Sequence, residues 1–180
     1  SIADLIQTIN PGLDVIPASW NLLTEATEKG SATRLKRALE PLKKKYGLIV
    51  IDTPPTAGEL QYNALCAATS LLIPLEADIY NLQGLYQMVD TARHIKQNNK
   101  DLKQMGFIIT KLDGRSVIVR QMQEQIIVAA NKVGVNYLGS VRKGVVVQEA
   151  AALQRDLYEY APRSKAAQDY LAILSAGKYA

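Results

Sequence analysis

The sequence is poor in the residues that build metal and redox sites, with one cysteine, Cys66, and one histidine, His94, among 180 residues. A single cysteine excludes an intramolecular disulfide and is typical of a reducing compartment, so we expect a cytoplasmic protein. With one histidine and one cysteine, neither a Cys/His zinc cluster nor a Ser/His/Asp triad can be assembled. No apolar run approaches the roughly 20 residues that a membrane-spanning helix needs, so we expect no such helix.

A phosphate-binding loop is also missing, because no G-x-x-x-x-G-K-[ST] pattern occurs within residues 1–60. The glycines of this region, Gly12, Gly30, Gly47 and Gly58, are isolated from one another. They therefore offer no run of successive backbone N–H groups that could wrap a triphosphate. We expect that this chain alone does not hydrolyse ATP and contains no catalytic residue.

The composition supports one sizeable core, since 48% of the residues are hydrophobic. We expect a single domain over residues 1–180. The formal net charge of +4 and the pI near 9.1 suit a protein that meets nucleic acid or an acidic surface, although charge alone decides little.

Strand-like apolar runs alternate with amphipathic helical patterns along the chain. Strands separated by helices of ten or more residues predict an α/β fold with a mostly parallel sheet flanked by helices. The predicted strands cover residues 13–17, 48–52, 71–75, 106–110 and 135–138. The predicted helices cover residues 33–46, 60–69, 82–97, 117–133, 146–154 and 164–174.

The strongest candidate site residue is Asp52, which ends the apolar run of residues 48–52 and precedes Pro54 and Pro55. Neither proline has an N–H to continue a β-ladder, so the run predicts a buried strand that delivers a carboxylate to a loop. Open α/β sheets bind ligands at the carboxyl ends of their strands. The alternative is that Asp52 caps a helix or accepts hydrogen bonds within its loop, which aspartates often do.

Several short segments occur in an order that resembles the ParA/MinD-type ATPases, the Soj-like proteins that partition plasmids and chromosomes. The first of these segments are Val50-Ile51-Asp52-Thr53-Pro54-Pro55, Asn63-Ala64-Leu65-Cys66-Ala67-Ala68, Leu72-Ile73-Pro74-Leu75 and Leu82-Gln83-Gly84-Leu85. Gln148-Glu149-Ala150 and residues 160–171 are similar to the closing segment of that family. The ordered succession is more specific than any one segment.

The resemblance implies a phosphate-loop NTPase fold of the deviant Walker type whose first strand and phosphate loop are absent from this chain. It implies that the intact protein binds ATP and Mg²⁺, with Asp52 holding the metal through water. The loop that follows would sense the γ-phosphate and couple it to dimerisation, and its matching residues are Thr53, Pro54, Pro55 and Gly58. The family's partners are a second subunit, nonspecific DNA and a centromere-binding ParB-like protein, and its members act on the nucleoid.

The segment Thr110-Lys111-Leu112-Asp113 is compatible with either adenine or guanine as the nucleotide base. It resembles the guanine-reading [NT]-K-x-D motif of GTPases, including the signal-recognition-particle type. ParA-like proteins commonly carry Thr-x-x-Asp at this place, however, and adenine is the favoured interpretation. Thr110, Lys111 and Asp113 are therefore candidate base contacts, with Arg142 added from the segment after the next strand, where the family usually has Ile-Pro-Arg. An ordinary strand end followed by an Asp-Gly turn fits either base.

Two sets of basic residues are candidates for DNA contact, which needs positive charge without base reading. The favoured set resembles the family's nonspecific DNA-binding face and comprises Arg115, Arg120, Arg142, Lys143 and Arg163. In the predicted helix over residues 33–46, which Pro41 is expected to bend, a solvated face is favoured over a DNA surface. That helix carries Arg34, Lys36, Arg37, Lys43, Lys44 and Lys45.

The sequence is compatible with two alternative functions. One is a non-enzymatic protein that keeps a DNA- or subunit-binding surface after loss of the phosphate loop, and the other is a GTPase related to the signal-recognition-particle type. The last predicted helix has few lysines, unlike the basic membrane anchor of MinD-type relatives, so we expect no membrane partner.

Overall fold

The computed structural model describes residues 2–19, 21–22, 32–54 and 58–176. The chain divides into two compact units, which are described separately. Unit 1 comprises Ser1–Thr69 and His94–Lys103, and unit 2 comprises Ser70–Arg93 and Gln104–Ala180.

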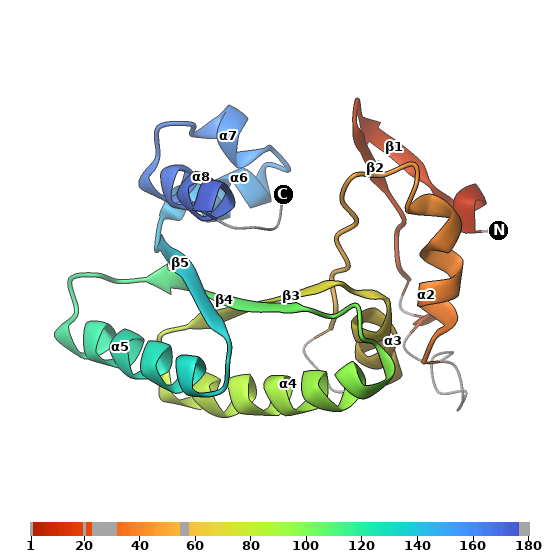
Figure 1. The fold of residues 1–180 in the computed structure, drawn as a ribbon. Coiled ribbons are helices and arrows are strands. Elements are labelled where there is room, and N and C mark those ends of the chain that lie inside the picture. Colours follow the sequence, from red (N-terminus) through yellow and green to blue (C-terminus); the bar gives the residue numbers. More distant parts are fainter. Residues whose placement is uncertain (1, 20, 23–31, 55–57, 177–180) are drawn as a thin grey trace. The chain divides into compact units, whose positions relative to one another are not determined.

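Unit 2 is built on a parallel sheet with the strand order β3-β4-β5 (Figure 1). The strands are β3 (Ser70–Glu76), β4 (Gln104–Leu112) and β5 (Asn136–Arg142). The connections run through α4 (Ile79–Asn98) and α5 (Val117–Lys132). The predicted α/β class with a parallel sheet is confirmed, and these five elements lie within a few residues of their predicted bounds.

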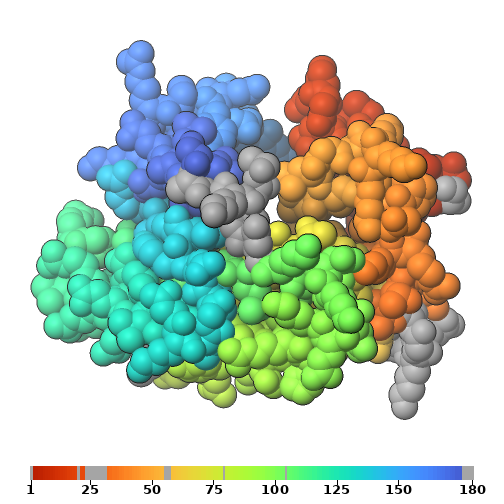
Figure 2. All heavy atoms as spheres, in the orientation of Figure 1, coloured from red at the N-terminus to blue at the C-terminus, as the bar shows by residue number. Residues whose placement is uncertain are grey.

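The core of unit 2 lies between the sheet and the helices α4 and α5. Phe107 and Ile109 of β4 are fully buried, as are Leu85 of α4 and Ile126 of α5. In Figure 1 both helices lie on the same side of the strands, and the space-filling view in Figure 2, in the same orientation, shows the atoms of this part of the chain in close contact. The alternation of buried and exposed residues along β3 shows that one face is covered, as the period of two in a strand requires.

The other face of β5 is covered by the last helix of the described residues. The segments after β5 form α6 (Val145–Ala152), α7 (Leu157–Tyr160) and α8 (Lys165–Ala176). A Cβ atom at Gly139 of β5 would lie 2.7 Å from Cγ1 of Ile173, and Gly139 has φ +147°. Glycine is therefore required where α8 packs against the strand.

Unit 1 contains short elements rather than a continuous sheet. Its first two strands pair antiparallel, so the strand predicted over residues 13–17 forms only in part and outside the parallel sheet. The elements are η1 (Ile2–Leu5), β1 (Gln7–Asn10), β2 (Leu13–Val15), α2 (Arg34–Leu39), η2 (Glu40–Leu42) and α3 (Glu59–Ala67). The helix predicted over residues 33–46 is not one regular helix, because α2 gives way to η2 at Glu40, next to Pro41.

The prediction of a buried strand over residues 48–52 is wrong for this structure. These residues have no assigned helix or strand, and the side chains of Leu48 and Val50 are 68% and 81% exposed. An apolar run becomes a buried strand only when a neighbouring strand accepts its backbone hydrogen bonds. Among the described residues, no strand pairs with this run.

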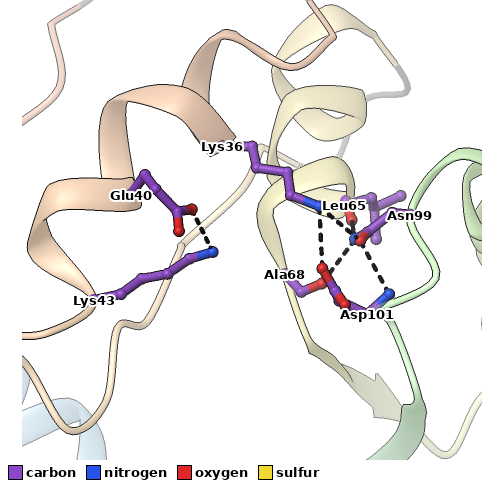
Figure 3. Close-up of polar contacts among 7 residues, drawn as sticks. All are labelled: Lys36, Glu40, Lys43, Leu65, Ala68, Asn99 and Asp101. Atoms are coloured by element: carbon purple, nitrogen blue, oxygen red, sulfur yellow. Dashed lines mark hydrogen bonds and ion pairs between the residues drawn. The ribbon is translucent and has the colours of Figure 1, made fainter.

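Several polar contacts of unit 1 centre on Asn99, which is 2% exposed. Figure 3 shows its side-chain amide donating to the carbonyls of Leu65 and Ala68 at the end of α3, both at 2.9 Å. Its carbonyl oxygen accepts from Lys36 Nζ at 3.3 Å and from the backbone N–H of Asp101 at 3.3 Å. One amide thus ties α2, the end of α3 and the segment after α4 together. Within the described part of the chain, no helix is both long and apolar enough to cross a bilayer.

Candidate functional site

Polar contacts join the carboxyl ends of the three parallel strands of unit 2. Lys111 Nζ lies 2.6 Å from Oε1 of Glu76, and Thr110 Oγ1 donates to the carbonyl of Leu75 at 3.2 Å. On the other side of β4, the backbone N–H of Lys143 donates to the carbonyl of Leu112 at 3.0 Å. The sheet therefore brings the predicted residues of the two loops together at the edge where parallel α/β sheets bind ligands.

The end of β4 has an irregular backbone. Its register with β5 shifts between Ile109 and Leu112, so β4 has one extra residue there, and Lys111 has φ +53°. A long side chain rarely adopts this left-handed conformation, and irregular, bulged strand ends occur next to functional sites. The strain falls on the residue that the sequence singled out as a base contact.

Asp113 is engaged by its own loop. Its Oδ1 accepts the backbone N–H of Arg115 at 3.1 Å and lies 3.5 Å from that arginine's Nε, and its carbonyl accepts the backbone N–H of Ser116. This is the Asp-Gly turn that the sequence allowed. A guanine-reading aspartate must offer its carboxylate to the base, and here one of the two oxygens is already occupied.

Arg142 is held by Asp169 of α8. Its Nη2 lies 2.6 Å from Oδ1, its Nε lies 2.8 Å from Oδ2, and its backbone N–H donates to Oδ2 at 3.0 Å. The hydrogen bonds from Arg142 hold the pKa of Asp169 below its ordinary value, and Asp169 raises the pKa of Arg142. Arg142 was predicted both as a base contact and as a DNA contact, and its charge is largely balanced by this partner.

The other predicted DNA contacts are more exposed. The side chain of Arg115 is 96% exposed. Arg120, Lys143 and Arg163 are also exposed, and none of these three forms an ion pair with another described residue. In the alternative basic set of unit 1, by contrast, local acids and amides engage several members. Lys36 contacts Asn99 and Asp101, and Lys43 lies 2.7 Å from Glu40 (Figure 3). Lys45 lies 3.7 Å from Asp14.

The residues of the predicted switch loop lie in unit 1. Asp52 is exposed, Thr53 and Pro54 are half-buried, and Gly58 precedes the first residue of α3. Pro55 lies outside the described residues. No group of three or more His, Cys, Asp or Glu that could hold a metal ion occurs within the described ranges. Asp52 could therefore serve only as a single carboxylate toward a hydrated Mg²⁺, which needs one or two such groups.

Sequence reasoning missed three residues that fix the end of β5. Gln123 of α5 donates to the hydroxyls of Tyr137 and Ser140, both at 3.1 Å, and the two hydroxyls lie 2.6 Å apart. Tyr137 and Ser140 are three positions apart and would face opposite sides of a regular strand, but a register shift at this point places both toward α5. Asp169 was also missed, because it lies 27 positions from Arg142 along the chain. For Tyr137 and Ser140 the sequence signal was their nearness to the end of a predicted strand.

A parallel sheet with polar residues gathered at its strand ends places unit 2 in the class of α/β domains that bind ligands at that edge. Comparison with solved structures agrees on the fold. The protein described as the Cyanothece McdA(D38A)–ATP complex matches with a TM-score of 0.82 at 19% identity, covering 97% of this chain and 70% of that one. Pyrococcus furiosus MinD, a cell division ATPase, matches with a TM-score of 0.73 at 19% identity, covering 97% and 69%.

Sequence comparison gives the family. A family model described as an AAA domain matches residues 1–104. The sporulation initiation inhibitor protein Soj of Bacillus subtilis is 36% identical over 177 residues, which are 94% of this chain and 69% of Soj. The chromosome partitioning protein ParA of Myxococcus xanthus is 36% identical over 166 residues, 89% of this chain and 58% of that protein. The chain belongs to the ParA/Soj family of chromosome-partitioning proteins, and it spans about two thirds of the length of these relatives or less.

Proposed function

We propose that this chain is part of a ParA-like partition ATPase that, in its intact form, binds ATP with Mg²⁺, dimerises and binds DNA nonspecifically. A ParB-like centromere-binding protein would stimulate hydrolysis, and the protein would work on the nucleoid in the cytoplasm. The observation that carries this proposal is the 36% identity to Soj over 94% of the chain. The polar strand ends of unit 2 and the Asp52 loop supply two of the parts that such an enzyme needs.

Each predicted site residue would have its own role toward the nucleotide. Thr110, Lys111, Asp113 and Arg142 would lie near the base, and Asp52 would hold the water shell of Mg²⁺, which neutralises charge on the phosphates. Thr53, Pro54, Pro55 and Gly58 would respond to the γ-phosphate. The chain has no glycine-rich loop to wrap the phosphates, so we expect no hydrolysis by this chain alone.

Calorimetry with ATP and Mg²⁺ tests the proposal. The 180-residue chain is compared with a chimera in which a segment carrying a strand and a G-x-x-x-x-G-K-[ST] phosphate loop is added before residue 1. We expect binding by the chimera and none by the chain alone. Loss of binding in a chimera with Asp52→Asn, beside retained binding with Asp4→Asn, would link Asp52 to Mg²⁺. A folded chimera that binds no nucleotide would favour a non-enzymatic interaction protein.

The choice of base can be tested in the same chimera. We expect ATP to bind more tightly than GTP, because one carboxylate oxygen of Asp113 is committed to the turn before Arg115. A preference for GTP would instead favour the GTPase related to the signal-recognition-particle type.

DNA binding is tested by fluorescence anisotropy of the nucleotide-loaded chimera on duplexes of unrelated sequence. Replacing Arg120, Lys143 and Arg163 by alanine should weaken binding to all duplexes alike and reduce the salt slope by about one per lost phosphate contact. The matched control replaces three exposed basic residues of unit 1, Arg37, Lys44 and Lys100, by alanine. Equal losses in the two triple variants, or a marked sequence preference, would contradict the assignment of this face.

A further inference from the structure

The end of β5 is held from two sides. Asp169 binds Arg142 through three hydrogen bonds, two to the guanidinium group and one to the backbone N–H, at distances of 2.6, 2.8 and 3.0 Å. The next residue, Lys143, donates its backbone N–H to Leu112 at the end of β4. Asp169 thus fixes the point at which β5 leaves the sheet, and with it the register between the ends of β4 and β5.

The pairing also decides which ligand chemistry suits Arg142. Two of the three donors, Nε and Nη2, belong to the planar guanidinium group, whose orientation the bidentate contact fixes. The side chain of Arg142 is 45% exposed, whereas that of Asp169 is 15% exposed. Because the carboxylate balances the charge, the guanidinium plane suits a flat, uncharged ring better than a phosphate. The neighbouring Lys143 is exposed and has no acidic partner among the described residues, so it suits a phosphate.

We propose that Asp169 is a positioning residue for a purine base, because it holds the guanidinium plane of Arg142 as a stacking surface beside the strained end of β4. The inference rests on the proposed nucleotide function and adds to it the residue that orients the base contact. It also removes Arg142 from the DNA-binding set and assigns it to the base alone.

The test uses the chain itself, with adenosine as a probe that has no phosphates and needs no phosphate loop. Backbone amide chemical shifts of the labelled 180-residue chain are followed during titration with millimolar adenosine. We expect shifts confined to residues 110–113 and 142–144. Asp169→Asn should weaken adenosine binding by about tenfold and speed hydrogen exchange of the Lys143 amide. The control Glu159→Gln removes one exposed carboxylate from α7 and should change neither.

A conservative variant separates positioning from general stability. Arg142→Lys keeps the positive charge and the backbone N–H that Asp169 accepts but loses the planar group. It should leave exchange of the Lys143 amide unchanged while weakening adenosine binding by about tenfold, whereas Asp169→Asn should alter both.

The outcomes distinguish this inference from the proposed function. Undiminished adenosine binding by a folded Asp169→Asn chain would overturn the inference, whatever the chimera does with ATP. Absence of any adenosine response in the unaltered chain would also overturn it. Failure of the chimera to bind ATP, beside normal adenosine shifts in the chain, would instead reject the partition ATPase and leave a base-binding site.

Discussion

Two apolar runs of similar composition differ in strand pairing and burial between the two units. Residues 71–75 of unit 2 lie in β3, where every residue from Ser70 to Glu76 pairs with β4 and where Ile73 and Leu75 are buried. Residues 48–51 of unit 1 have no pairing strand among the described residues, and Leu48 and Val50 are largely exposed. Apolar composition permits a buried strand, but a neighbouring ladder is what makes one.

The largest effect should come from the core of unit 2. Phe107→Ala removes a fully buried aromatic ring and should lower the free energy of unfolding by about 3–5 kcal/mol. The matched change in unit 1, Val50→Ala, removes an exposed side chain and should alter it by less than about 0.5 kcal/mol. Chemical denaturation followed by circular dichroism measures both. Similar losses at the two positions would show that residues 48–51 are packed as tightly as β4.

Unit 1 should depend on its buried amide more than on its apolar run. Asn99→Ala leaves the carbonyls of Leu65 and Ala68 without their side-chain donor and removes one of the two contacts of the Lys36 amine, so it should destabilise the chain by about 1–3 kcal/mol. Asn98→Ala, at the exposed neighbouring position, should cost less than about 0.5 kcal/mol. Thermal unfolding monitored at several wavelengths compares the two variants. If Asn99→Ala leaves the stability unchanged, the buried amide does not stabilise unit 1.

The Arg142–Asp169 pair should make the stability of unit 2 depend on pH in the acid range. Because the pKa of Asp169 is lower in the folded chain than its ordinary value of 3.8, the pair stabilises the fold at neutral pH. This contribution is lost as the pH falls from that ordinary value through the folded pKa. Asp169→Asn should therefore lower stability at pH 7 but change it less at pH 2, which denaturation at the two pH values measures. An equal loss at both would exclude the ion pair as the cause.

The smallest effect should come from the exposed ion pair of unit 1. Lys43 and Glu40 lie 2.7 Å apart, but their side chains are 42% and 64% exposed. Lys43→Ala should change stability by less than about 0.5 kcal/mol, and 0.5 M salt should remove the difference. A larger loss that salt does not affect would mean that Lys43 acts through contacts other than Glu40.

The sequence predicted the elements of unit 2 well because each is long and has a clear period. The helix predicted over residues 117–133 is α5, and the strand predicted over 106–110 lies inside β4. The prediction from the sequence was wrong at residues 48–52, because a local pattern cannot show whether a partner strand is present. Thr110, Lys111 and Asp113 lie at or just after the end of a predicted strand and could be found from the sequence. Asp169 lies 27 positions from Arg142, and only the packing of α8 on β5 brings them together.

Amide hydrogen exchange of the 180-residue chain, resolved by residue, tests the contrast between the two runs most directly. We expect slow exchange for the amides of β3 that pair with β4, and fast exchange throughout residues 48–51. Slow exchange in both runs would contradict it, because it would mean that residues 48–51 form a hydrogen-bonded strand in this chain.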